Sequence, residues 1–213
     1  MTKFANKRAI TGALLAGGRG RRMGTDKALL PFAGGATLAE GVLAVLAAVC
    51  DEVLVVARPG QRDGTAWPQG VRAVTDRAEF PVCALSGIHA ALEAAAHPWV
   101  LVMAADLPFP SAALATGLID IALERGEPTL VVPEVGGVVH PLVGVYHRSL
   151  AREIARRIGN GELRVQALAR ECGHLVPEPT VRGWDPELAG LINVNTPDEL
   201  AGARARLAGK AGS

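Results

Sequence analysis

Two runs of apolar residues constrain the fold of this chain more than any other feature. Residues 52–57 are rich in β-branched side chains, and residues 99–104 are apolar throughout. A strand that is apolar on both faces needs cover on both faces, which is typical of parallel sheets in α/β proteins. Stretches with helical patterns lie between these runs and other short apolar segments. We therefore expect a Rossmann-like, three-layer α/β/α domain with a mostly parallel central sheet.

The same patterns place the other elements along the chain. Thr37 and Ser111 are suited to cap helices, and Pro197 is suited to the first turn of one. The strands that we expect are residues 9–15, 52–57, 71–75, 99–104, 129–133, 142–146 and 191–194, and the helices are 38–49, 84–96, 112 to about 125, 149–158, 162–172 and 197 to about 207.

The composition limits the class of protein. The chain has 213 residues, which suffices for one sizeable core, so we expect a single domain over residues 1–213 with frayed ends at 1–8 and 208–213. A net charge of +1 gives no reason to expect a nucleic-acid or membrane surface, and no apolar run reaches transmembrane length. The three cysteines form no Cys-x-x-Cys pair, which favours reduced thiols in a cytoplasmic protein.

A glycine-rich basic segment, residues 14–27, follows the first expected strand. Its glycines, Gly17 and Gly18 among them, allow positive φ angles and a close approach of the backbone to a ligand. Successive N–H groups in such a loop bind anions, and Arg22 and Lys27 add positive charge. No Gly-Lys-Ser/Thr closes the loop and no Gly-x-Gly-x-x-Gly follows the strand, so it is neither a Walker loop nor a dinucleotide fingerprint. A flexible basic connection is the alternative, but the loop's place at the carboxyl end of a strand favours phosphate binding.

The order Leu15-Ala16-Gly17-Gly18, then Arg22-Met23-Gly24, then Asp26-Lys27 resembles the signature of nucleotidyltransferases that act on molybdopterin. The resemblance is to the molybdenum cofactor guanylyltransferases in particular, within a GT-A-like superfamily that also includes sugar-phosphate nucleotidyltransferases and cytidylyltransferases. It implies a nucleotide-binding role for Leu15, Ala16, Gly17, Gly18 and Lys27, and a catalytic role for Arg22 and Lys27.

Asp106 follows the apolar run 99–104 and precedes Pro108. An Asp at the end of a buried strand lies at the edge of the sheet where such folds bind ligands, and Mg²⁺ is held by one or two carboxylates together with substrate phosphates. A turn that Asp106 caps is the alternative. In the family, an Asp at this place is the metal ligand, so the resemblance implies that Asp106 binds Mg²⁺ and the nucleotide and is catalytic.

Asp76 follows the third expected strand, where the family has an Asp in its guanine-nucleotide pocket; a turn cap is again the alternative. The next segment departs from the family, with Cys83 and Ala84 where glycine and proline are common. Family members often carry a nucleotide-contacting Asn after the second strand, whereas this chain has Ala57 and Arg58 there. We therefore expect that contact to be absent or made by the backbone.

Four residues are candidates for the side of the site that faces the second substrate. The resemblance assigns His140, Arg164, Asn193 and Asn195 to the pterin side. Asn193 and Asn195 alternate on the expected strand 191–194 and its end, so both could point to the active site. The alternatives are a turn histidine at 140, a solvated helix charge at 164, and a helix cap formed by residue 195 or 196.

The resemblance implies a Mg²⁺-dependent transfer of GMP from GTP to the terminal phosphate of molybdopterin or of the molybdenum cofactor, with release of pyrophosphate. It implies no nucleic-acid or membrane partner, and transient contact with proteins that deliver or accept the cofactor. Transfer of another nucleotide such as CMP, or to another phosphate acceptor, is one alternative. A non-catalytic nucleotide- or pterin-binding protein on the same scaffold is the other.

Overall fold

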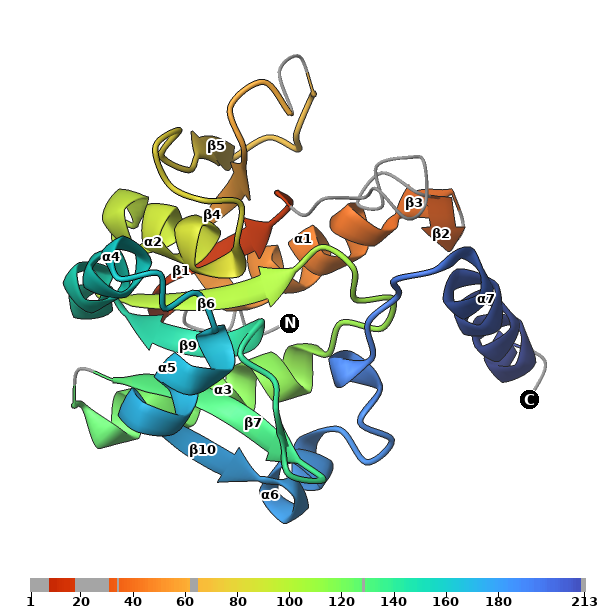
Figure 1. Ribbon diagram of the computed structural model, residues 1–213. Coiled ribbons are helices and arrows are strands. Elements are labelled where there is room, and N and C mark those ends of the chain that lie inside the picture. Colours follow the sequence, from red (N-terminus) through yellow and green to blue (C-terminus); the bar gives the residue numbers. More distant parts are fainter. Residues whose placement is uncertain (1–7, 18–30, 34, 62–64, 128, 212–213) are drawn as a thin grey trace.

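A computed structural model describes residues 8–17, 31–33, 35–61, 65–127 and 129–211. Its centre is one sheet with the strand order β10-β7-β9-β6-β1-β4-β5, to which β8 adds by pairing with β7 (Figure 1). The strands are β1 (Arg8–Leu15), β4 (Cys50–Ala57), β5 (Val71–Thr75), β6 (Trp99–Ala104), β7 (Leu130–Val135), β8 (Val138–Val139), β9 (Val143–His147) and β10 (Gly173–Pro177).

Most pairings of this sheet are parallel, as the sequence predicts. Strand β1 runs parallel to β4 on one side and to β6 on the other, and Leu15 at its end is in register with Val56 and Ala104. Strand β5 continues the parallel arrangement beside β4, and β10 does so beside β7. The exceptions are β9, which lies antiparallel between β6 and β7, and β8, which pairs antiparallel with β7. The sheet is therefore mixed, and β9 begins at the edge where β6 ends.

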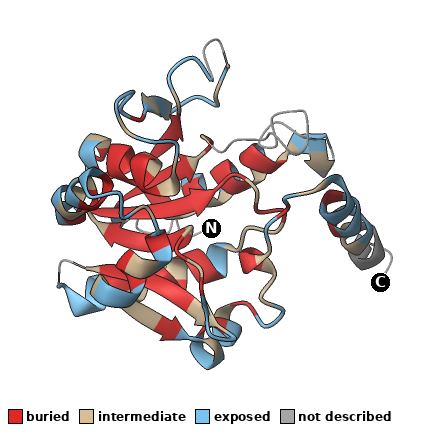
Figure 2. Ribbon diagram, in the orientation of Figure 1, coloured by how far each residue is buried: buried red, intermediate tan, exposed pale blue. Residues whose placement is uncertain are grey.

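Helices cover both faces of the sheet and complete the predicted three layers (Figures 1 and 2). One core lies between the sheet and α1 (Leu38–Val49), α3 (Ala112–Arg125) and α6 (Glu178–Trp184). The other lies between the sheet and α2 (Ala84–Ala94), α4 (Ala151–Gly159) and α5 (Val165–Cys172). Among the described residues, no helix combines the length and the apolar character that a membrane crossing requires.

Strand β1 sits at the middle of the sheet and is buried on both faces. Ile10 and Leu14 belong to the core under α1, and Ala13 belongs to the opposite core. A Cβ on Gly12 would lie 3.1 Å from both Leu46 Cβ and Cys50 Sγ. The glycine therefore lets α1 pack closely on β1, which holds the end of this strand in place.

The C-terminal helix α7 (Pro197–Ala211) packs on a small third core, away from the central sheet. This core joins Leu200 of α7 to Phe32, which lies in the hairpin of β2 (Pro31–Ala33) and β3 (Ala36–Thr37), and to Phe109. The rings of Phe32 and Phe109 meet edge to face at 5.6 Å between centroids, and Arg204 donates a hydrogen bond to the Pro31 carbonyl. Helix α7 thus connects β2 with the segment that follows β6.

The structure departs from the expected elements mainly in the last fifth of the chain. The prediction of a strand at 191–194 is wrong. A short 3-10 helix, Ala189–Leu191, precedes residues 192–195, which belong to no strand. Leu191 and Val194 are buried in two different cores rather than paired in the sheet. Neither β10 nor α6 was predicted, since β10 contains Gly and His and α6 contains Pro and Gly. The β2–β3 hairpin was likewise not predicted.

Candidate active site

The carboxyl ends of β1, β4 and β6 form one edge of the sheet. Beyond the paired residues, the Ala16 N–H donates to the Val56 carbonyl at 2.8 Å, and the Ala105 N–H donates to the Leu15 carbonyl at 3.2 Å. The turn that leaves β1 is therefore fixed between the end of β4 and the segment leading to Asp106. This arrangement brings Leu15, Ala16 and Gly17 beside the residues that follow the neighbouring strands.

Gly17 is the first glycine of the basic loop and the only one of its glycines within the described residues. Its φ angle lies outside the left-handed region, so a positive φ at this position is not what requires glycine. A Cβ here would be in ordinary contact with Arg58, 3.6 Å from its N and 3.7 Å from its Cγ. Gly17 therefore presents bare backbone next to Arg58. The candidates Gly18, Arg22 and Lys27 lie outside the described residues.

Asp106 lies two residues after β6, half-buried at the same edge. Its carbonyl accepts a 2.9 Å hydrogen bond from the Val194 N–H. Within the described part of the chain, no group of three or more His, Cys, Asp or Glu side chains is placed to hold a metal ion. One carboxylate at a phosphate-facing edge fits the way Mg²⁺ binds, with most of its ligands being water and substrate phosphates.

Asn193 and Asn195 lie on either side of Val194 and are both exposed, whereas Val194 is buried. The bond from Val194 to Asp106 places this segment next to the candidate metal ligand, although the segment is not the expected strand. The helix cap is formed by Thr196, whose hydroxyl accepts from the Glu199 N–H at 3.2 Å. The Glu199 carboxylate in turn accepts from the N–H groups of Thr196 and Asn195. This capping box confirms the helix start expected at Pro197 and leaves both Asn side chains exposed.

Asp76 follows β5 and is almost completely buried, with 7% of its surface exposed. Its N–H donates to the Ala57 carbonyl at 3.1 Å, and its Oδ2 lies 3.8 Å from Arg58 Nη1. Burial raises the pKa of the Asp76 carboxyl, and the Arg58 charge opposes this rise. Sequence reasoning gave Arg58 no role, although an arginine directly after a buried strand was a signal in the sequence.

Helix α2 begins beside this edge. A Cβ on Gly87 would lie 3.4 Å from Leu15 Cδ2, so the first turns of α2 pack over the end of β1. The Ser86 hydroxyl donates to the Pro81 carbonyl at 2.7 Å and stabilises the turn that leads into the helix.

His140 reaches the same edge from the opposite direction. Its N–H donates to the Pro133 carbonyl at 2.9 Å, and two residues later the Leu142 carbonyl accepts from the Ala104 N–H at 3.0 Å. Burial lowers the pKa of the His140 imidazole, which favours the neutral ring at pH 7.

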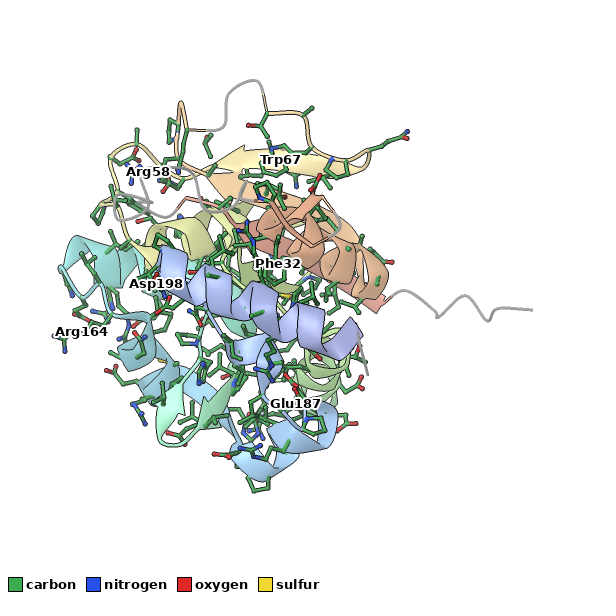
Figure 3. All side chains as sticks on the ribbon, turned by 90° about the vertical axis from the view of Figure 1, so that its right-hand side faces the viewer. Phe32, Arg58, Trp67, Arg164, Glu187 and Asp198 are labelled. Carbon is green, nitrogen blue, oxygen red and sulfur yellow. The ribbon has the colours of Figure 1, made fainter. Side chains whose placement is uncertain are left out.

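Arg164 lies apart from this group. It occupies the N-cap position of α5 and is exposed. In Figure 3 it projects from the edge of the molecule, below Arg58 in that view. The described contacts do not bring it to Asp106.

The site combines a glycine turn after the first strand with a carboxylate, Asp106, after a central parallel strand. A polar segment is joined to the Asp106 backbone through Val194. This combination is that of a nucleotidyltransferase of the α/β class. The family model described as "MobA-like NTP transferase domain" matches residues 12–175. The chain is 36% identical to a probable molybdenum cofactor guanylyltransferase of Chloroflexus aggregans, covering 90% of this chain and 91% of the relative. It is 32% identical to the molybdenum cofactor guanylyltransferase of Desulfosudis oleivorans, covering 93% and 96%.

Solved structures agree with these relatives. The crystal structure of molybdopterin-guanine dinucleotide biosynthesis protein A from Archaeoglobus fulgidus superposes with a TM-score of 0.80 at 27% identity, covering 93% of this chain and 99% of that one. The 2-C-methyl-D-erythritol 4-phosphate cytidylyltransferase of Thermus thermophilus has a TM-score of 0.62 at 25% identity, covering 93% and 98%. The chain belongs to the family of MobA-like nucleotidyltransferases, among the molybdenum cofactor guanylyltransferases, which confirms the resemblance noted in the sequence.

Proposed function

We propose that this protein transfers GMP from GTP to the terminal phosphate of molybdopterin, or of its molybdenum-loaded form, with Mg²⁺ as cofactor and pyrophosphate as the second product. The proposal is supported by relatives named molybdenum cofactor guanylyltransferase, whose similarity to this chain covers nine-tenths of its length. The structural observation that carries it is the bond between Leu15 and Ala105, which sets the start of the basic loop beside Asp106.

In this reaction an oxygen of the acceptor phosphate attacks the α-phosphorus of GTP, and the bond from that phosphorus to the β-phosphate oxygen breaks. The attacking oxygen is already anionic, so no strong general base is required. Catalysis then depends on positioning and on neutralising the charge that develops on the α-phosphate and the leaving pyrophosphate. The N–H groups of the loop, from Gly17 and Gly18 onward, would bind the phosphates together with Arg22 and Lys27. Asp106 would hold Mg²⁺, which would supply positive charge to neutralise the phosphates during the transfer.

The acceptor would approach from the side of His140, Asn193 and Asn195. His140 follows the β7–β8 turn and precedes β9 at this edge, and a neutral imidazole can both donate and accept a hydrogen bond. The amides of Asn193 and Asn195 offer the same versatility to a pterin ring. The role of Arg164 at the pterin phosphate stays a prediction, because the residue lies at the start of α5, apart from the other three. The proposal places the protein in the cytoplasm, in transient contact with proteins that deliver or receive the cofactor.

The first test is the shift in melting temperature caused by GTP, CTP, UTP and ATP, each with and without Mg²⁺. A ligand that binds only the folded state stabilises it by about 2.7 kcal/mol at a hundred times its Kd. We expect a shift selective for GTP, dependent on Mg²⁺ and lost in Asp106→Asn. The matched control is Asp51→Asn, an exposed carboxylate at the opposite end of β4, which should respond as the wild type does.

Three results would change the assignment. A larger shift with CTP or UTP would contradict GMP transfer. A full GTP shift with Mg²⁺ in Asp106→Asn would remove Asp106 as the metal ligand. GTP binding without pyrophosphate release in the presence of molybdopterin would favour the non-catalytic alternative.

A further inference from the structure

A partly buried arginine, Arg58, lies against the start of the glycine loop. Arg58 directly follows β4, and its N and Cγ are the nearest atoms to the position that a Cβ on Gly17 would take. Its side chain is 23% exposed, but its Nη1 atom is fully buried and forms no hydrogen bond with any described residue. A buried charged donor without a hydrogen-bond acceptor is costly, so its presence at the edge of a candidate ligand site indicates a function.

Asp76, which directly follows the neighbouring strand β5, has a buried acceptor atom in a similar position. Ala57 and Thr75 are in register in the β4–β5 pair, so Arg58 and Asp76 follow the two strand ends side by side. The distance of 3.8 Å from Arg58 Nη1 to Asp76 Oδ2 is too long for a hydrogen bond. Asp76 Oδ1 is buried and has no hydrogen-bond partner among the described residues. The two charges therefore neutralise each other, while one donor atom and one acceptor atom keep hydrogen-bonding capacity that no described residue uses.

A ligand that satisfies both atoms must carry donors and an acceptor along one edge. Guanine does so, because its N1–H and 2-amino group are donors and its O6 is an acceptor on the same side of the ring. Arginine paired with O6 and N7 of guanine is the commonest specific contact in nucleic-acid recognition. Adenine carries an amino group in place of O6. This amino group would place a hydrogen-bond donor opposite the donors of the guanidinium.

We propose that Arg58 selects the guanine base by donating to O6, while Asp76 accepts from N1–H and the 2-amino group. This inference rests on the proposed use of GTP and adds a residue for which the sequence suggested no nucleotide contact. Arg58 also opposes the effect of burial on the pKa of Asp76, so it helps to keep the carboxylate in its accepting form. The planar guanidinium suits the site because its fixed N–H directions can place a charged donor in the plane of the base.

The test compares the Kd of GTP with that of 6-thio-GTP, in which sulfur, a weak acceptor, replaces O6. Both are measured by calorimetry with Mg²⁺ on the wild type, Arg58→Met and Arg58→Lys, with Arg152→Met as the control for loss of an exposed arginine. We expect the wild type to prefer GTP by about tenfold, the effect of weakening one hydrogen bond from a charged donor. Arg58→Met should lose that preference because only GTP binding weakens, and Arg152→Met should retain it.

Arg58→Lys keeps a cation beside Asp76 but lacks the planar pair of donors, so it too should lose most of the preference. It carries the test if Arg58→Met does not fold. An equal loss of affinity for GTP and 6-thio-GTP in both variants would overturn the assignment, since it would show a contact with phosphate or ribose or an effect on folding. Absence of GTP binding by the wild type would instead refute the proposed function, and the inference with it.

Discussion

Tyr146 ties the interior of the protein to the side of the site that would receive the second substrate. It lies on β9 with no exposed surface, and its hydroxyl donates a 2.6 Å hydrogen bond to the Pro141 carbonyl. Pro141 directly follows His140 and leads into β9. The substitution Tyr146→Phe keeps the ring in its core and removes only the donor, so it isolates this one bond.

The size of the effect follows from the burial of both groups. Burial of the ring raises the pKa of the Tyr146 phenol, which therefore stays protonated and able to donate. Leaving a buried carbonyl without its donor costs about 1–3 kcal/mol of unfolding free energy. For a chain of this size, each kcal/mol lowers Tm by about 2–4 °C. We therefore expect Tm to fall by about 2–12 °C.

The assay combines thermal unfolding with steady-state kinetics. Thr129→Val is the matched control, because the Thr129 hydroxyl also donates at 2.6 Å to a backbone carbonyl, that of Cys172, outside the described site. Both variants should lose Tm, but only Tyr146→Phe should raise KM for the molybdopterin substrate, with KM for GTP unchanged. An unchanged Tm in Tyr146→Phe would refute the assigned cost of the bond. Equal kinetic effects in the two variants would refute its positioning role.

Two further predictions concern stability alone. Gly117→Ala should lower Tm, because its Cβ would lie 2.2–2.6 Å from the Trp184 ring and overpacking costs about 1–3 kcal/mol. The control is Gly202→Ala, which has no neighbour within 4 Å and should not lower Tm. Equal Tm values for the two variants would contradict the close packing of α3 on α6. Burial raises the pKa of Glu52, but hydrogen bonds from Ala96, Arg72 and Thr11 outweigh this and lower it overall. A carboxyl whose pKa is lower in the folded than in the unfolded state stabilises the fold at pH values above its unfolded pKa. This stabilisation is lost as the pH falls through the folded pKa. Urea unfolding should therefore show the stability advantage of wild type over Glu52→Gln shrinking below about pH 4.5, and a constant difference would be inconsistent with this linkage.

Local patterns in the sequence were sufficient for the strands that form the site. The run Trp99–Ala104 is apolar throughout because β6 is covered on both faces, and it matches the predicted strand at both ends. The position of Asp106 at the edge of the sheet follows from that strand. The helix Leu38–Val49 is also as predicted, since the Thr37 hydroxyl accepts from the Glu40 N–H and the Thr37 N–H donates to the Glu40 carboxylate.

The remaining features depend on contacts between distant segments. Leu191 and Val194 have the spacing of a short strand, but their burial comes from two separate cores that only the folded chain creates. Arg58 and Asp76 meet because β4 and β5 pair in one particular register, which neither residue encodes locally. The assignments of His140, Arg164, Asn193 and Asn195 to the second substrate remain predictions.

The packing of α7 gives the protein an order of assembly during translation. Every described strand precedes α7 in the sequence, so the ribosome completes the sheet before it makes the helix that Arg204 links to Pro31 across 173 residues. A nascent chain that ends before Val194 has its sheet but lacks the donor that holds the Asp106 carbonyl. The edge that carries the candidate active site is therefore completed only after the sheet, and a chain interrupted before Val194 lacks the backbone contact that joins this edge to residues 192–195.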